Sequence, residues 1–334
     1  MIGSGEPRDG TPYRFLHAGS IRRERMERMP TFPVLRSETA WEEASFAPGL
    51  LRAYRPGDHD VTVTCSFPFT NWVLRRPLAG GKRPPHVFVT QNGDWPAYSN
   101  QSEYRSFGCE GLVCTNPDFF ERNRAAWRCA LIPNGIDADR FTPGPAERER
   151  LGLPNEGPLV LMVSALIPTK RVDDGIRAVS AIEGAHLVVA GDGPERDAVD
   201  ALAAKLLPGR FRRITVAAAD MPALYRSADV FLHMSREESF GNVFIEALGC
   251  GVPVVGHDTA RLRWIVGDSA VLVDTTDPAG VAAALARAMG ERAALTSRGV
   301  ERARRFAWTQ VAAQYREFLQ EVVDASATRR AQPR

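Results

Sequence analysis

The pattern of apolar and polar positions divides the chain into a regular second half and a less regular first half. From residue 158 onward, short apolar runs rich in β-branched residues alternate with segments of helical periodicity. Such alternation predicts a parallel sheet covered on both faces, with ligands bound outside the carboxyl ends of its strands. We expect strands at residues 159–163, 186–190, 213–216, 229–233, 252–256 and 270–273, and helices at 172–182, 195–207, 222–227 and 242–249.

The first half follows the same pattern with weaker regularity. Prolines and glycines cluster at residues 141–157, which predicts a linker between two domains there. A last helix is expected at residues 309–323, and the tail from residue 326 is expected to be disordered. Strands are expected at residues 60–65, 86–90, 111–115 and 130–132, and helices near 40–54, 71–76 and 117–126.

Length and composition are those of a soluble protein of two domains. The chain has 334 residues, of which 44% are hydrophobic and 25% charged. It has no run of about 18 apolar residues, and its polar start lacks the apolar core of a signal peptide, so a cytoplasmic protein is expected. A net charge of +2 gives no indication of nucleic-acid binding. Five cysteines without a C-x-x-C pair fit reduced thiols.

The most informative stretch is S-R-E-E-S-F-G-N-V-F-I-E-A-L-G-C-G-V-P-V-V at residues 235–255. Glu238 and Glu246 are separated by seven residues, and Phe-Gly between them opens a predicted helix. A helix N-terminus suits an anionic group such as a diphosphate, and Gly241 permits close backbone approach. Glu246 can accept hydrogen bonds from both hydroxyls of a ribose, and Glu238 in the preceding loop can reach a hydroxylated ring. Taken alone, the pair could also be a loop glutamate and a solvated helix glutamate.

With its surroundings, the stretch resembles the E-x7-E signature of retaining glycosyltransferases of the GT4 family, also called glycosyltransferase group 1. The resemblance extends from about residue 86 to residue 323 and is densest in the second half. It implies an α/β protein with the GT-B fold, in which two Rossmann-like doubly wound domains face each other across a cleft, here with an abbreviated N-terminal domain. The implied parts are an acceptor-side domain at residues 1–145, a nucleotide-sugar domain at 146–308 and a C-terminal helix at 309–325.

Two further segments carry the resemblance. Residues 132–137, I-P-N-G-I-D, followed by Phe141 and Pro143, resemble the segment with which GT4 enzymes leave their first domain. The turn A-G-D-G-P at residues 190–194 matches the family's turn near the nucleotide base. As a dinucleotide fingerprint this turn fails, because Arg196 occupies the third glycine position, and hydride transfer is therefore disfavoured.

The resemblance implies transfer of a hexose from a UDP- or GDP-linked sugar to an acceptor hydroxyl, with retention of the anomeric configuration. Glu238, Lys170 and Asp94 are the predicted catalytic residues. Lys170, the helix dipole and the backbone amides after Phe240 would stabilise the departing diphosphate. The predicted substrate-binding residues are Glu246, Ser239, Phe240, Gly241, Asn242, Val243, Arg171, Gly191 and Asn92.

The chain departs from the family pattern in its diphosphate-binding loop, residues 163–173. Lys170 matches the family, but the usual arginine is here Ala165. Losing a charge-assisted contact to a phosphate costs on the order of 1.5 to 3 kcal/mol. Arg171 could compensate for this loss, and a solvent-facing arginine is the alternative.

Two more departures concern the first half. The family carries a histidine after the strand at residues 86–90, where this chain has Q-N-G-D. Asn92 cannot act as a general base, so Asp94 is the nearest candidate, with a simple turn as the alternative. A glycine pair is also missing after residues 13–20, so the family's opening βα unit is either absent from this chain or diverged.

Metal and cofactor use are not expected. Cys109, Cys114 and Cys129 match no common zinc spacing, and buried thiols explain them better. The D-x-D patterns at residues 58–60 and 137–139 resemble the metal motif of GT-A glycosyltransferases but lack its context.

Two other functions stay open: a catalytically inactive protein that binds nucleotide sugars, and a hydrolase or epimerase that uses the same donor site. The acceptor is unknown, and no nucleic-acid partner is expected. Basic runs at residues 22–25 and 302–305 fit solvated helix faces. The alternative for these runs is attraction to anionic lipid head groups, which would place the protein at the inner face of the membrane.

Overall fold

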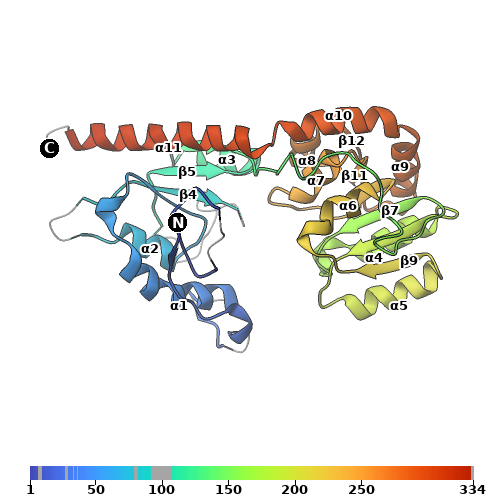
Figure 1. The fold of residues 1–334 in the computed structure, drawn as a ribbon, viewed down its shortest axis with the longest axis horizontal. Coiled ribbons are helices and arrows are strands. Elements are labelled where there is room, and N and C mark those ends of the chain that lie inside the picture. Colours follow the sequence, from blue (N-terminus) through green and yellow to red (C-terminus); the bar gives the residue numbers. More distant parts are fainter. Residues whose placement is uncertain are drawn as a thin grey trace. The chain divides into compact units, whose positions relative to one another are not determined.

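The computed structural model describes residues 1–6, 10–26, 29–32, 34–35, 37–78, 82–91 and 107–331. They form two compact α/β units (Figure 1). The first unit consists of Met1–Ile132 together with Ala313–Arg334, and the second of Pro133–Ala312. Both contain parallel sheets flanked by helices, as the alternating pattern of the sequence predicts.

The first unit is built on a four-stranded parallel sheet in the order β3-β4-β5-β6. Its two central strands are buried along their whole length, as expected for strands covered on both faces. A separate parallel pair joins β1 and β2. The elements are β1 (Ile2–Gly3), β2 (Leu16–His17), α1 (Glu38–Ala53), β3 (Thr62–Thr64), α2 (Phe69–Arg75), β4 (His86–Thr90), β5 (Gly111–Cys114), α3 (Pro117–Asn123) and β6 (Cys129–Leu131).

Three cysteines of the first unit lie in its hydrophobic core. Cys109, Cys114 and Cys129 pack in one cluster with Phe88 and Phe119. All five cysteines of the chain are free thiols, as their count and spacing predict. Among the described residues, no group of three or more His, Cys, Asp and Glu side chains could hold a metal ion.

The long C-terminal helix α11 (Trp308–Ala331) begins in the second unit and continues in the first. Phe318 and Val322 are buried, and a Cβ at Gly111 of β5 would lie 2.6 Å from Val322 Cγ2, so the helix packs closely on this strand. The expectation of a disordered tail from residue 326 is wrong for residues 326–331, which continue the helix. Alanine and arginine extend an existing helix easily, because nucleation has already occurred.

The second unit is a six-stranded parallel sheet in the order β12-β11-β10-β7-β8-β9. All six predicted strands and all four predicted helices of this unit exist, with ends shifted by at most about two residues. The elements are β7 (Leu159–Val163), α4 (Val172–Ser180), β8 (His186–Ala190), α5 (Arg196–Leu206), β9 (Phe211–Ile214), α6 (Met221–Arg226), β10 (Val230–His233), α7 (Asn242–Gly249), β11 (Val254–His257), α8 (Ala260–Val266), β12 (Ala270–Val273), α9 (Pro278–Gly290) and α10 (Arg292–Arg304).

Alternate residues of the central strand face two hydrophobic cores, one on each side of the sheet. Leu159 and Leu161 of β7 pack in a cluster with α6, α7 and α8. Val160 and Met162 pack in a second cluster with α4, α5 and α9. Because side chains of a strand alternate between faces, a continuous apolar run such as this one is explained by burial on both sides.

The segment at residues 141–157, where prolines and glycines cluster, packs on the second unit. Phe141 and Leu153 are buried in its core. Arg148 forms an ion pair with Asp229 at 2.7 Å, and the Glu147 N–H donates to Ser227 Oγ at 2.9 Å. The segment therefore belongs to the second unit in its contacts.

Candidate functional site

The order of the strands in the second unit identifies the edge at which a ligand would bind. The chain adds β8 and β9 on one side of β7, and then β10, β11 and β12 on the other. β7 and β10 are thus parallel neighbours whose connections leave in opposite directions. In open α/β sheets, the crevice beyond the carboxyl ends of two such strands is the usual ligand site. Lys170 follows β7 and Glu238 follows β10, so two of the three predicted catalytic residues flank this point.

These two side chains are in direct contact. Lys170 Nζ donates to Glu238 Oε1, and His233 Nε2 lies 2.8 Å from the same oxygen. The exposed fractions of the Lys170, Glu238 and His233 side chains are 21%, 20% and 3%. Burial disfavours the carboxylate, but the hydrogen bonds and charges of His233 and Lys170 outweigh burial and lower the pKa of Glu238 to about 2. Glu238 is therefore ionised at neutral pH.

The loop that carries Glu238 is also held through its backbone. Arg261 Nη1 of α8 donates to the Glu238 carbonyl, and Ser235 Oγ donates to the Glu237 carbonyl at 2.8 Å. Ser239, a predicted substrate-binding residue, is half-buried in this loop. Side chains of the second unit thus hold both the carboxylate and the backbone carbonyl of Glu238.

Helix α7 begins directly after this loop. Gly241 precedes it with φ 81°, and a Cβ at this position would lie 2.7 Å from the Phe244 ring, so glycine is required for both conformation and space. Asn242 Oδ1 accepts from Asn134 Nδ2 at 3.0 Å, and Val243 is partly buried against the core. The first N–H groups of a helix have no acceptor inside the helix, which leaves them available to an anion.

Phe240 occupies a different place from its neighbours in the motif. Its side chain is 2% exposed and packs against Trp264 and Phe306. The predicted binding role of this residue is therefore limited to its backbone, while its ring anchors the start of α7 in the core.

Glu246 has a different partner from Glu238. Tyr225 of α6 donates its hydroxyl hydrogen to Glu246 Oε2 at 2.8 Å. Burial raises the pKa of Glu246, and the hydrogen bond from Tyr225 and the charge of Arg140 only partly oppose this rise. Burial also raises the pKa of Tyr225 well above its ordinary value, so the tyrosine stays a hydrogen-bond donor.

The predicted diphosphate loop packs on the turn that contains Gly191. The backbone N–H of Ser164 donates to the Ala190 carbonyl at 3.1 Å, and that of Leu166 donates to the Asp192 carbonyl at 3.0 Å. A Cβ at Gly191 would lie 1.9 Å from the Ser164 carbonyl oxygen, so this glycine allows the two loops to approach. Gly191 therefore has a packing role, and Ala165 between the two contacts is exposed.

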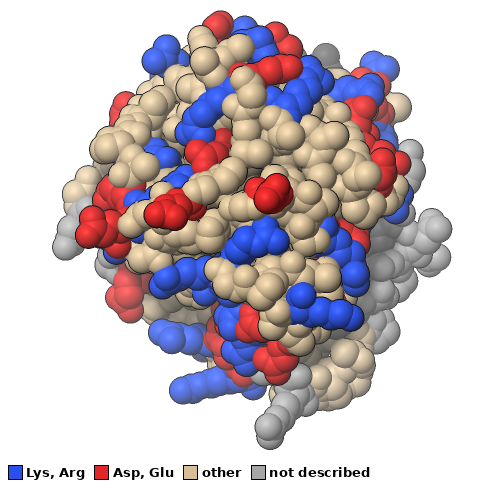
Figure 2. Space-filling view, turned by 90° about the vertical axis from the view of Figure 1, so that its right-hand side faces the viewer, with Lys and Arg blue, Asp and Glu red and all other residues tan. Residues whose placement is uncertain are grey.

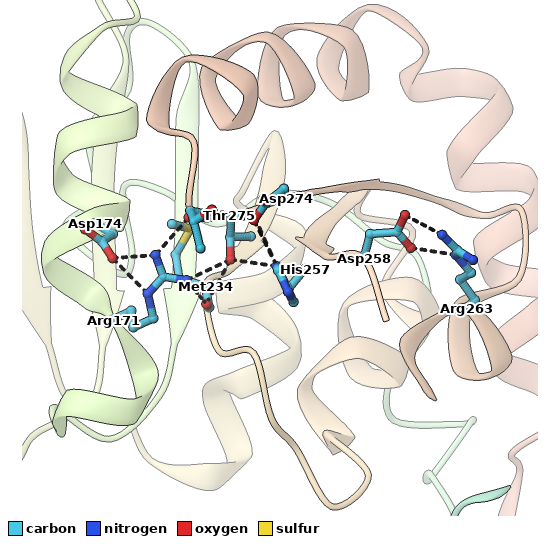
Figure 3. Close-up of polar contacts among 9 residues, drawn as sticks. Arg171, Asp174, Met234, His257, Asp258, Arg263, Asp274 and Thr275 are labelled. Carbon is cyan, nitrogen blue, oxygen red and sulfur yellow. Dashed lines mark hydrogen bonds and ion pairs between the residues drawn. The ribbon is translucent and has the colours of Figure 1, made fainter. Parts of the chain in front are cut away.

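The guanidinium of Arg171 is bound by protein atoms on several sides (Figure 3). Nη1 donates to Thr275 Oγ1 at 2.9 Å and to the Met234 carbonyl at 3.4 Å, and Nη2 donates to the Thr275 carbonyl at 2.9 Å. Asp174 lies 2.6 Å from Nη2 and compensates the charge. Thr275 in turn donates its backbone N–H to His257 Nδ1 at 3.1 Å. Arg171 thus contacts the ends of β10 and β12 as well as its own helix.

The remaining predicted site residues, Asn92 and Asp94, lie outside the described residues. The pocket of about 570 Å³ in the first unit is lined by β3 and α1, including Thr62, Thr64 and Glu43. None of the predicted site residues lines it. It is therefore distinct from the Lys170 and Glu238 cluster of the second unit.

His233, Tyr225, Arg261 and Asn134 contact the predicted site residues and were not foreseen from the sequence. His233 has a recognisable signal, because it is the polar end of the otherwise apolar strand V-F-L-H. Tyr225 and Arg261 lie on neighbouring helices, and only the packing of those helices brings them to Glu246 and to the Glu238 loop.

Surface charge and helix composition are the two features relevant to the predicted membrane contact. On the face of the described residues that Figure 2 shows, basic and acidic side chains are intermixed without a large patch of one sign. None of the described helices is both long enough and apolar enough to cross a membrane.

Known proteins resemble this chain over most of its length. Residues 144–306 match the family described as Glycosyl transferases group 1. The D-inositol 3-phosphate glycosyltransferase of Thermomonospora curvata is 36% identical over 333 residues, which cover 82% of this chain and 74% of that protein. The same-named protein of Salinispora tropica is 34% identical, covering 60% of this chain and 48% of its own length. The chain thus spans about half the length of several relatives that it matches.

Solved structures show the same fold at lower identity. Sucrose-phosphate synthase from Thermosynechococcus elongatus has a TM-score of 0.70 at 22% identity, covering 84% of this chain and 79% of that one. HepE of Anabaena, in complex with UDP-glucose, has a TM-score of 0.66 at 18% identity, covering 85% and 82%. The fold is GT-B, as the motifs predict.

Proposed function

Because the chain belongs to the group 1 glycosyltransferase family, we propose that it is a retaining glycosyltransferase that uses a nucleotide diphosphate sugar. The observation that carries this proposal is the cluster of Lys170 and Glu238 at the switch point of the second sheet. In this proposal the Lys170 cation serves the diphosphate and the adjoining Glu238 carboxylate serves sugar hydroxyls, shortly before the start of α7. The transferred group is a hexose, and the acceptor is a hydroxyl.

Each residue of the cluster has a distinct role in this proposal. Lys170 and the first amides of α7 bind the diphosphate and stabilise the charge that grows on it as it leaves. Glu238 binds hydroxyls of the sugar ring. Glu246 binds the ribose, where its carboxylate accepts from the hydroxyls. Glu238 compensates the charge of Lys170, so a bound diphosphate would compete with Glu238 for the Lys170 ammonium.

The bond changes balance without a group from outside the two substrates. The bond between the sugar C1 and the diphosphate oxygen breaks, and the acceptor oxygen forms a bond to C1 on the same face. The proton of the acceptor hydroxyl passes to the departing phosphate oxygen. Retention follows because the entering and leaving oxygens occupy the same face of the ring.

The names of similar proteins suggest which substrates to test first. HepE is seen in complexes with UDP and with UDP-glucose, so UDP-glucose is the first donor to test. Several relatives are named D-inositol 3-phosphate glycosyltransferase, so an inositol phosphate is the first acceptor. Both choices are part of the proposal, since the relatives are longer proteins.

A thermal-shift panel of UDP-, GDP- and ADP-sugars, followed by product analysis with and without acceptor, tests the proposal. A ligand at about 100 times its Kd stabilises the folded state by about 2.7 kcal/mol, which raises the Tm measurably. We expect one donor class to raise the Tm and a glycosylated acceptor to form. Donor binding without turnover would identify an inactive binding protein, and loss of the sugar to water would identify a hydrolase. If no nucleotide sugar raises the Tm, the donor site is assigned wrongly.

A further inference from the structure

Arg171 has an unusual backbone conformation. Among the described residues it is the one non-glycine residue with a positive φ, at φ 52° and ψ 44°. The left-handed region is unfavourable for a residue with a Cβ, and such a conformation persists where the surroundings hold it in place. It lies between the turn Pro168–Lys170 and the first residue of α4. The contacts of the Arg171 side chain are candidates for what holds this conformation in place.

That side chain is engaged by four acceptor atoms from three segments: Asp174 Oδ2, the Met234 carbonyl, and Thr275 Oγ1 and its carbonyl. It is 19% exposed, and Asp174 compensates its charge at 2.6 Å. Arg263, drawn at the opposite side of Figure 3, is 65% exposed and pairs with the side chain of Asp258 at 2.6 Å. Arg171 thus binds main-chain atoms of the fold, whereas Arg263 forms a surface ion pair.

The acceptors belong to the segments that carry the proposed site. Lys170 is the chain neighbour of Arg171, and Met234 opens the loop that ends in Glu238 and α7. Thr275 follows β12, and its hydroxyl also donates to the Met234 carbonyl at 3.3 Å. A planar guanidinium can bind several acceptors in fixed directions at once, which an ammonium cannot.

We propose that Arg171 is a positioning residue, which ties the Lys170 turn to the start of the Glu238 loop and so fixes the distance between cation and carboxylate. This inference rests on the proposed function for the meaning of that distance, but the tie itself is independent of it. In this role Arg171 does not need to contact substrate, because protein acceptors already engage its guanidinium. The role differs from that of a second diphosphate-binding cation, which the absence of an arginine at position 165 had suggested.

The test compares Arg171→Gly, Arg171→Lys and Thr275→Val with the surface control Arg263→Ala. Glycine removes the tie and relieves the left-handed backbone, so any loss cannot be caused by backbone strain. Lysine keeps the charge without the planar donors. We expect kcat for transfer to fall on the order of 10- to 100-fold in the first three variants, because misplacement by about 1 Å costs this much. The donor KM should change less than threefold, and Arg263→Ala should match wild type.

Two further readouts separate this role from the alternatives. Hydrogen exchange of the amides at residues 234–241 should speed up in Arg171→Gly, and the double variant with Thr275→Val should lose little more than either single variant. A fall in nucleotide affinity that Arg171→Lys restores would instead assign Arg171 to the diphosphate and overturn the proposal. Unchanged kcat, or unchanged exchange, in Arg171→Gly would overturn it too.

The proposed function can fail separately. A wild-type protein without turnover of any nucleotide sugar would contradict the transferase assignment. Hydrogen exchange at residues 234–241 needs no substrate and would still decide whether Arg171 holds the loop.

Discussion

The two ends of the E-x7-E motif differ in their electrostatic surroundings, although seven residues separate them and both side chains are partly buried. The Glu238 carboxylate is held by His233 and Lys170, and its pKa is lowered to about 2. The Glu246 carboxylate has a neutral hydroxyl as its partner, and burial raises its pKa. Burial acts in the same direction at both sites, so the difference comes from the partners.

Glu238 is thus ionised and ion-paired, whereas Glu246 is a carboxyl with a raised pKa and a neutral partner. Glu238 neutralises the charge of Lys170, and in the proposed site the donor diphosphate binds the same lysine. Donor binding must therefore rearrange the contact between Glu238 and Lys170. Glu246 holds no ion pair with Lys170, and its hydrogen bond to Tyr225 can persist when a hydroxyl of the donor arrives. We therefore expect changes near Glu238 to affect the reaction most and changes near Glu246 to affect binding.

Removing Lys170, the cation paired with Glu238, should have the largest effect on turnover. Lys170→Ala should lower turnover on the order of 1000-fold, about 4 kcal/mol of barrier, because the leaving diphosphate loses its main positive partner. The measurement is the rate of nucleotide release in the presence of acceptor. Lys205→Ala removes an exposed lysine of α5 and serves as the control.

The missing arginine provides a complementary change. Ala165 is exposed beside the same turn, so Ala165→Arg restores the cation that the family usually has and should tighten donor binding. Near-normal nucleotide release by Lys170→Ala would show that Lys170 is not the main positive partner of the diphosphate and that another cation has this role.

Neutralising Glu238 while keeping its size should have the next largest effect. Glu238→Gln should lower kcat on the order of 100-fold, because its contact with the sugar ring matters most in the transition state. It should also raise the affinity for free nucleoside diphosphate, since Lys170 loses its ion pair. The exposed Glu237→Gln makes the same charge change one residue away and should leave both quantities unchanged. If only the donor KM rises, the role of Glu238 at the ring is wrong.

The same variant tests the low pKa through stability. The pKa of Glu238 lies below its ordinary 4.5 in the folded state, so its ionisation stabilises the fold above pH 4.5 and the stabilisation is lost as the pH falls toward 2. The wild-type protein should lose on the order of 3 kcal/mol more than Glu238→Gln across this range. Chemical denaturation at a series of pH values measures the difference, and parallel curves would contradict it.

The sequence predicts the second unit well because its strands are continuous apolar runs between polar turns. Residues 159–163, 186–190 and 270–273 are strands with the predicted ends, and residues 242–249 are the predicted helix α7. The parallel sheet and its two-sided core follow from the β/α alternation, whereas the order of the strands comes from the structure. Helices α9 and α10 were not predicted, because the alanine-rich α9 and the highly charged α10 have little contrast between faces.

From the sequence, the residues of the candidate site could be identified and assigned to the loops after particular strands, but their contacts with one another could not be predicted. A motif identifies Glu238, Glu246 and Lys170, but it cannot show that Lys170 and Glu238 pair with each other. It also cannot find Tyr225, whose contact with Glu246 depends on how α6 packs on α7. Arg171 illustrates the same limit, since its partners Met234 and Thr275 are more than 60 residues away in the chain.

At the other end of the motif, Glu246→Ala should weaken donor binding without changing the fold. Loss of a contact to buried hydroxyls costs about 1 to 3 kcal/mol, and we expect about 2. Calorimetry with the donor measures the change, and far-UV circular dichroism checks the fold. Glu301→Ala removes an exposed carboxylate of α10 as a control. An unchanged donor affinity would remove Glu246 from the site.

The smallest effect is expected from the partner of Glu246. Tyr225→Phe keeps the ring in the core and removes only the hydroxyl that donates to Glu246 Oε2, so the free energy of unfolding should fall by about 1 kcal/mol. The hydrogen bond opposes the effect of burial on Glu246, so its loss should raise the pKa of this carboxyl further. A raised pKa means that the protonated form persists to higher pH, where it accepts fewer hydrogen bonds from ribose hydroxyls. Donor affinity in the variant should therefore decline at a higher pH than in the wild type as the pH is lowered, with little difference on the alkaline side. Calorimetric titration from pH 5 to 9 tests this, and identical pH profiles for the two proteins would show that Tyr225 does not control the ionisation of Glu246.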